Sequence, residues 1–273
     1  MERKSILLYA LIGLIFFFSA CSRTAIVQND REEMGLKGAV RSVTITGYEA
    51  LDLDSAIVKD NLWYTRTITF DRSGRIREII DADGKEIYTY SSRSRTIRRY
   101  DTDGELDTKE VTTYTPRGEI LSWTQYDASD TILSQEQYRY DAQNRCIEKT
   151  IYSPMSFDLI CRDYTYDEAG NRTSYTAYNP DLTPFYSWRC CYDSLGRKTS
   201  EDWLEPNGIL SGRFTYEYNE KGYLLVEGID DKYTNTYTYE YDEQGNWTRK
   251  YTTYAGGYDQ PSFAIEEQTI VYF

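Results

Sequence analysis

The side chains that could do chemistry in this chain are carboxylates, thiols and aromatic rings, because the sequence contains no histidine. Without imidazole there is no Ser-His-Asp or Cys-His nucleophile system and no His-ligated metal. The 44 carboxylates guarantee that some lie in close pairs, as glycoside hydrolysis requires, but the sequence singles out no two of them. We therefore expect no enzymatic activity and no cofactor.

Two acidic turns, Asp81 to Gly84 and Asp101 to Gly104, resemble fragments of a calcium-binding loop, since each reads Asp-x-Asp-Gly. A complete calcium site needs about 6 to 8 oxygen ligands, and neither fragment has the remaining carboxylates at loop spacing. An Asp that precedes Gly in a hairpin also caps the turn through its own side chain. The pattern favours structural turns and predicts no metal site.

Aromatic side chains are the candidate binding residues. Trp123 and Tyr175 each lie nine positions after a repeated aromatic anchor, so we expect them to share a face and to be available to a ligand such as a sugar. Trp247 lies six positions after its anchor, where other repeats carry Ile or Leu, which favours packing. The alternative is that every tyrosine and tryptophan is structural. The five tryptophans are Trp63, Trp123, Trp188, Trp203 and Trp247.

The thiols have no partner that the repeat would place opposite them. If the loops at 153–157 and 179–183 turn symmetrically, Cys146 faces Tyr164, Cys161 faces Lys149 and Cys190 faces Arg172. In that register no two cysteines are opposed, although an oxidising compartment would permit disulfides. We expect mostly free, partly buried thiols at Cys146, Cys161, Cys190 and Cys191.

Charge excludes one class of partner. The chain has 31 basic and 44 acidic residues and a formal net charge of -13. Nucleic acid binding depends on Lys and Arg that displace counterions from phosphates, so we expect no nucleic acid partner.

These residues are positioned by an internal repeat. An aromatic residue, usually followed by Asp or Asn, precedes a Gly by four positions, and the anchors from Tyr114 to Tyr218 are spaced by 26 residues each time. Asn144 takes the Gly slot once, which suits a turn because Asn tolerates positive φ. The anchors are Phe70, Tyr114, Tyr140, Tyr166, Tyr192, Tyr218 and Tyr241, and the turn glycines are Gly74, Gly118, Gly170, Gly196, Gly222 and Gly245.

Each 26-residue unit is predicted to hold two strands and two turns. The Asp-x-x-Gly segment makes a hairpin, and Pro154, Pro180 and Pro206 mark the turn half-way through each unit. Tyrosines two positions apart, such as Tyr138 and Tyr140, share one face of a strand. The pattern predicts an all-β, antiparallel hairpin-repeat sheet of about 14 to 16 strands, curved or rolled, with almost no helix. It does not decide between an open sheet and a closed barrel.

The N-terminus resembles a bacterial lipoprotein signal. Arg3 and Lys4 precede an apolar run from 6 to 18, and small residues lead directly to Cys21. Thirteen apolar residues are too few for a permanent transmembrane helix, which needs about 20. We expect residues 1–20 to be a signal peptide, Cys21 to carry the lipid, 21–36 to form a flexible tether and 37–273 to form the repeat domain. The membrane is then a partner through the lipid on Cys21.

The aromatic-Asp-x-x-Gly motif resembles the YD repeat of the RHS family over about 70–254, and the opening at 36–43 resembles lipoproteins of this type from Bacteroidota. The resemblance implies an antiparallel strand-turn sheet. Together with the signal it predicts an outer-membrane lipoprotein, on the periplasmic or surface face, that binds or presents a protein or glycan without catalysis. The alternatives are a purely structural envelope spacer and an accessory or immunity partner of an RHS-type toxin.

Overall fold

The computed structural model describes residues 29–53, 56–154, 158–256 and 261–273. Almost all of these residues belong to antiparallel hairpins. Within these ranges one short helix, α2 (Asp30–Glu33), precedes 18 strands. The predicted signal peptide and Cys21 lie outside the described residues. The strands are β1 (Val40–Leu53), β2 (Ala56–Phe70), β3 (Ile76–Asp81), β4 (Gly84–Tyr90), β5 (Ser94–Tyr100), β6 (Leu106–Tyr114), β7 (Ile120–Asp127), β8 (Ile132–Tyr140), β9 (Cys146–Tyr152), β10 (Leu159–Tyr166), β11 (Arg172–Tyr178), β12 (Pro184–Tyr192), β13 (Lys198–Leu204), β14 (Leu210–Tyr218), β15 (Leu224–Ile229), β16 (Tyr233–Tyr241), β17 (Trp247–Gly256) and β18 (Ser262–Tyr272).

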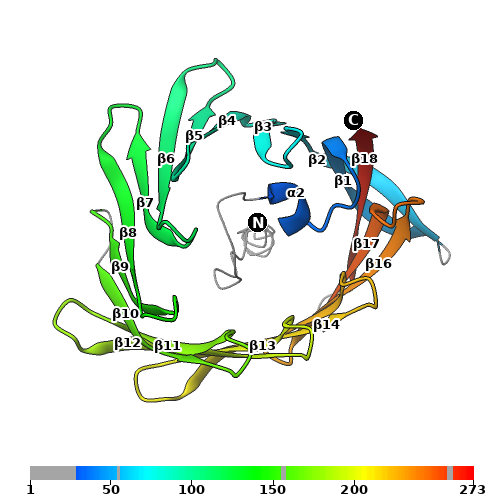
Figure 1. Cartoon of the computed structure of the whole chain (residues 1–273). Coiled ribbons are helices and arrows are strands. Elements are labelled where there is room, and N and C mark those ends of the chain that lie inside the picture. Colours follow the sequence, from blue (N-terminus) through cyan, green and yellow to red (C-terminus); the bar gives the residue numbers. More distant parts are fainter. Residues whose placement is uncertain (1–28, 54–55, 155–157, 257–260) are drawn as a thin grey trace, which may run out of the picture.

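The strands close into a barrel (Figure 1). Each strand pairs with the next along the chain, and β1 pairs with both β2 and β18, for example at Val43 with Ile68 and with Ile270. Closure satisfies the two strand edges that an open sheet would leave unpaired. The all-β prediction is confirmed, but the expected 14 to 16 strands were too few. The units before Tyr114 are shorter than 26 residues, so they hold more strands than that period implies. One example is the β3–β4 hairpin, which forms at the predicted Asp81 to Gly84 turn without an aromatic anchor.

Strands β8, β10, β12 and β14 end on their anchor tyrosines, so the 26-residue unit is a strand, an Asp-x-x-Gly turn, a strand and a second turn. In the unit after Tyr140, the Asp141 amide donates to the Arg145 carbonyl and the Asn144 amide donates to the Asp141 carbonyl. Asn144 has φ 61°, as its place in the Gly slot predicted. Asp141 Oδ1 also accepts from the amides of Gln143 and Arg145, both at 2.9 Å. The aspartate therefore caps its own turn.

Successive units are joined by a repeated tyrosine hydrogen bond. The hydroxyl of Tyr140 donates to the Ile120 carbonyl at 2.6 Å, and that of Tyr166 donates to the Cys146 carbonyl at 2.6 Å. Tyr192 donates in the same way to the Arg172 carbonyl at 2.9 Å. Each bond spans 20 residues and reaches the first residue of the second strand in the preceding unit. Such bonds contribute about 1 kcal/mol each and hold the units in register.

The inward face of the barrel follows from α2, which lies inside the ring of strands (Figure 1). Asp30 in α2 accepts from the Tyr90 hydroxyl at 2.7 Å, so Tyr90 points inward. Directly opposed residues share a face, and Tyr90 continues through Arg95, Thr112, Trp123 and Glu136 on successive strands. The same face of β8 carries Tyr138 and Tyr140. The prediction that paired tyrosines share a face is confirmed, and that face is the inside of the barrel.

Part of the predicted tether is structured. Asp30 and Leu36 are 5% and 8% exposed, and Asn29 caps α2 by accepting from the Glu32 amide. Leu36 packs in the main apolar cluster with Val40, Val43, Ile68, Phe70, Ile76 and Ile79. Burial of these side chains outweighs the cost of ordering a short segment. The tether expected over 21–36 was therefore wrong from residue 29 onward.

The turn aspartates make acid sensitivity an expected result. Hydrogen bonds from the backbone amides of Arg145 and Arg197 lower the pKa of Asp141 and Asp193, respectively. Among the described residues, ten carboxyl groups have a lowered pKa and only Asp30, through burial, has a raised one. A lowered folded-state pKa stabilises the fold above the unfolded value of about 4, and this contribution is lost as the pH falls through the folded value.

We expect the urea midpoint of unfolding to fall steadily as the pH is lowered from 5 to 2. Asp30 works in the opposite direction, because a raised pKa favours folding of the protonated form, but it is one group against ten. Asp141→Asn, which removes one of the ten, should show a shallower decline than the wild-type chain. Equal midpoints at pH 5 and pH 2 would contradict this assignment of the turn aspartates.

Candidate functional site

The two aromatic residues singled out by the sequence both face the interior but lie on different strands. Trp123, on β7, donates from Nε1 to Glu110 at 3.2 Å. Tyr175, on β11, lies opposite Trp188 of β12. Strands β8, β9 and β10 separate the two residues, so they do not form one platform. The shared face is confirmed, and the binding role of the two side chains stays a prediction.

Tyr175 instead belongs to a continuous group of inward rings on β10 to β13, here called the aromatic cluster. Its ring centroid lies 5.6 Å from that of Tyr164, 6.1 Å from Tyr186 and 5.4 Å from Trp188. The Tyr186 and Trp203 centroids are 5.2 Å apart. Trp188 is only 4% exposed, whereas the other four rings are half-buried. Rings at these separations stabilise one another and still present surface to the interior. The cluster comprises Tyr164, Tyr175, Tyr186, Trp188 and Trp203.

Arg172 places a cation within the aromatic cluster. Its guanidinium carbon lies 5.7, 5.3 and 5.1 Å from the ring centroids of Tyr164, Tyr175 and Trp188. Contacts at these distances are favourable cation–π interactions. The Arg172 Nε is buried and has no hydrogen-bond partner among the described residues. The guanidinium thus has hydrogen-bonding capacity that the described protein leaves unused.

Other inward cations sit beside carboxylates. Lys149 Nζ is 2.6 Å from Glu136, and Lys250 pairs with Glu266. Lys198 pairs with Glu201, which is 3% exposed and also accepts from Trp203 Nε1 at 2.7 Å. These pairs neutralise the charge of the interior locally and hold the neighbouring side chains in place.

Inward tyrosines are also hydrogen-bonded to inward acids. The hydroxyls of Tyr138 and Tyr237 donate to Glu136 and Glu227, respectively. Burial and the neighbouring carboxylate raise the pKa of both tyrosines, so the phenols stay protonated at neutral pH. The described interior therefore combines neutral rings with ion pairs such as Lys149–Glu136, and Arg172 differs from these pairs in having no carboxylate partner among the described residues.

Three thiols line the same region. Cys161 lies opposite Lys149, as predicted from the repeat, and burial raises its pKa to about 11. Cys190 donates from Sγ to the Arg172 carbonyl at 3.3 Å. None of the four described cysteines forms a disulfide; Cys146, Cys161 and Cys190 are buried and Cys191 is exposed. A raised pKa keeps Cys161 as an unreactive thiol at neutral pH.

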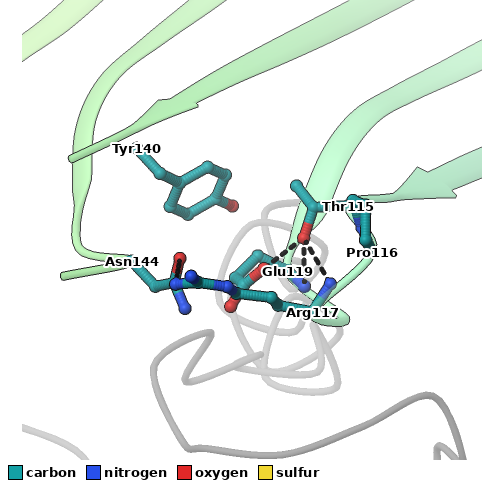
Figure 2. A pocket seen from close by; sticks show the side chains of 6 residues that line it. All are labelled: Thr115, Pro116, Arg117, Glu119, Tyr140 and Asn144. Carbon is teal, nitrogen blue, oxygen red and sulfur yellow. Dashed lines mark hydrogen bonds between the residues drawn. The ribbon is translucent and has the colours of Figure 1, made fainter. Parts of the chain in front are cut away.

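A separate hollow of about 230 Å³ lies between two neighbouring Asp-x-x-Gly-type turns (Figure 2). Arg117 Nη1 donates to Asn144 Oδ1 at 2.9 Å, and Thr115 bonds Glu119. These contacts join the turn after β6 to the turn after β8, which is a structural role. The lining residues are Thr115, Pro116, Arg117, Glu119, Tyr140 and Asn144.

The acidic turns behave as turns. Asp101 Oδ1 accepts from the amides of Asp103 and Glu105 at 3.0 and 2.9 Å, and Asp81 accepts from the Asp83 amide at 3.1 Å. Among the described residues no group of three or more His, Cys, Asp or Glu side chains is arranged to hold a metal ion. Nor does the described part of the chain contain a helix long and apolar enough to cross a bilayer.

We did not predict from the sequence that Arg172, Tyr186, Trp188 and Trp203 belong to one group. A signal was present: Arg172 lies six residues after Tyr166, at the position where Tyr140 is followed by Cys146 and Tyr218 by Leu224. An arginine in a slot that is usually apolar marks an unusual inward residue. Tyr186 and Trp188 of β12 join the cluster only because of the register between β11 and β12, and the sequence does not define that register.

Comparisons with known proteins indicate the class of fold. No protein-family model and no curated protein matches this sequence. A porin-like protein from Bacteroides uniformis is similar with a TM-score of 0.50 and 13% identity, over 86% of this chain and 98% of that chain. An outer membrane lipoprotein-sorting protein domain from Vibrio parahaemolyticus has a TM-score of 0.21 and 9% identity, over 89% of this chain and 91% of that chain.

A DUF1329 family protein from Desulfovibrio piger has a TM-score of 0.17 and 8% identity, over 85% of this chain and 86% of that chain. The last two similarities are too weak to carry an argument. The first supports the fold alone: a closed, antiparallel, all-β barrel.

Proposed function

We propose that this chain is a lipid-anchored, non-catalytic binding protein of the bacterial outer membrane that holds its ligand inside the barrel. The aromatic cluster carries this proposal, because four of its five rings remain partly exposed on the inward face. Ligand sites are typically aromatic surfaces with a few well-placed polar groups, and Arg172 supplies such a group. Barrels with this many strands enclose more space than their own side chains fill.

The outward face supports attachment by lipid over insertion of the barrel into the membrane. A membrane-spanning barrel has an outward apolar band flanked by aromatic girdles. Here the outward positions of β11 to β13 carry hydroxyl and charged groups, including Ser174, Thr176, Arg189 and Asp202. Asp202 bonds both Arg189 and Arg213. We therefore do not extend the pore function suggested by the name of the B. uniformis protein to this chain.

The motif supports a relationship to YD repeats, which we retain as a proposal. The repeated elements of the motif have separate structural roles in this chain: the tyrosine hydroxyl bonds the preceding unit, the Asp caps the turn and the Gly or Asn adopts positive φ. In this interpretation the repeat array is closed into a barrel by the pairing of β1 with β18.

A binding screen tests the proposed function. The full-length chain, purified in detergent, would be screened on a glycan array, and hits would be titrated by calorimetry. We expect Trp203→Ala to weaken binding of any hit by about tenfold, since it removes one half-buried ring of the cluster. Tyr152→Ala removes an exposed ring from the outward face of β9 and should leave binding unchanged. An absence of binding, with whole 26-residue units dispensable in cells, would favour the structural spacer.

A further inference from the structure

The position of Arg172 on β11 is unusual for a charged residue inside this barrel. The corresponding slot, six residues after the anchor, holds Ile76, Ile120 and Leu224 in other units. In the next unit the slot holds Lys198, and this lysine pairs with Glu201. Arg172 has three aromatic rings around it instead, and its buried Nε has no hydrogen-bond acceptor in the described residues.

An inward guanidinium that pairs with no carboxylate of the described chain is poised to bind an anion. A buried donor without an acceptor is unfavourable, so a ligand that supplies an acceptor to this guanidinium is favoured there. The planar guanidinium fork matches a planar carboxylate, to which it can donate two parallel hydrogen bonds. Arg172 as a whole is partly exposed, although its Nε is buried.

The surrounding rings indicate what carries that anion. Tyr164 and Tyr175 are half-buried on the inward side, and Tyr186 and Trp203 extend the aromatic surface away from the guanidinium. Flat aromatic faces pack well against ring-shaped ligands with apolar faces, such as sugars. The net charge of -13 gives an anion no long-range attraction, so recognition depends on direct contact at this point.

We propose that Arg172 and the aromatic cluster form a binding site for acidic sugars, in which the guanidinium binds the carboxylate of a uronic acid and the rings pack against the sugar. This proposal rests on the proposed binding function and specifies its ligand class. Lys198 cannot substitute for Arg172, because its ammonium is already paired with Glu201.

Calorimetry with trigalacturonate, its neutral counterpart galactotriose and galactose 6-sulfate tests the site on the full-length chain in detergent. We expect trigalacturonate to bind at least about tenfold more tightly than galactotriose, because only the acidic sugar accepts from the guanidinium. Arg172→Gln should abolish that preference. Arg172→Lys keeps the charge but loses the planar fork, so it should lose most of the preference. Its melting temperature should be closer to that of the wild-type chain than the melting temperature of Arg172→Gln is.

Arg139→Gln is the matched control, because Arg139 lies on the outward face of β8 and pairs with Glu148. It should change neither affinity nor preference. Equal binding of trigalacturonate and galactotriose would overturn the acidic-sugar assignment and leave the binding function standing. Tighter binding of the sulfated sugar would overturn the choice of a carboxylate. Failure of all three probes to bind, or an unchanged preference in Arg172→Gln, would overturn the site.

Discussion

Replacing Asp30 with alanine is expected to destabilise the protein by about 3 kcal/mol. One carboxylate oxygen of Asp30 accepts both from the Ile76 amide and from the Tyr90 hydroxyl, each at 2.7 Å. The other oxygen lies 4.0 Å from Arg95. Asp30 is 5% exposed, so its removal leaves donors in a region where water cannot easily replace the carboxylate. Urea unfolding followed by tryptophan fluorescence would measure the loss.

Two further variants separate this effect from the general loss of an acid. Glu32→Ala removes an exposed carboxylate from the same helix and should change stability by less than about 0.5 kcal/mol. Asp30→Asn retains an acceptor oxygen, so its loss of stability should lie between those of Asp30→Ala and Glu32→Ala. If Asp30→Ala and Glu32→Ala were equally stable, α2 would not be held inside the barrel by this carboxylate.

Gly84→Ala is expected to lower the free energy of unfolding by a similar amount, about 3 kcal/mol, because it forces two strands apart. Gly84 begins β4 with φ +135°, and a Cβ built on it would lie 2.1 Å from the backbone carbonyl oxygen of Tyr100 on β5. That contact is with backbone, so rotation of a side chain cannot relieve it. Thermal unfolding monitored by circular dichroism would measure the change.

Gly104→Ala is the matched control for this substitution. Gly104 also has positive φ, at +85°, but a Cβ there would meet no atom within 4 Å. Only the conformational cost of about 1 kcal/mol is expected. A Gly84→Ala variant no less stable than Gly104→Ala would show that β4 and β5 do not approach each other as described.

The repeating part of the fold could be predicted from sequence because it depends on local chemistry. The Asp-x-x-Gly turn is made by hydrogen bonds within five residues, as at Asp141 to Arg145, and the positive φ of Asn144 follows from its slot. The common face of Tyr138 and Tyr140 follows from the period of a strand. Each of these features needs only one unit of the repeat, and the sequence shows several.

Closure and the aromatic cluster depend on relations between distant segments. The pairing of β1 with β18 joins residues more than 200 positions apart, and nothing local to Val43 or Ile270 indicates it. The placement of α2 depends on a hydrogen bond between Asp30 and Tyr90, which are 60 residues apart in the sequence. Predicting the cluster around Arg172 would need the register of strands β10 to β13. Bulges near Tyr166 and Tyr192 shift that register. A one-residue slip would turn these side chains outward.

A disulfide across the closing strands tests the enclosed interior, on which the ligand proposals depend. Thr44 of β1 lies directly opposite Thr269 of β18 on the outward face. Opposed residues of antiparallel strands are close enough for a disulfide. In a Cys191→Ser background, oxidation of Thr44→Cys/Thr269→Cys should give an intramolecular bridge by non-reducing mass spectrometry, whereas Thr44→Cys/Thr236→Cys should keep both thiols. Free thiols in both pairs would contradict the closed barrel.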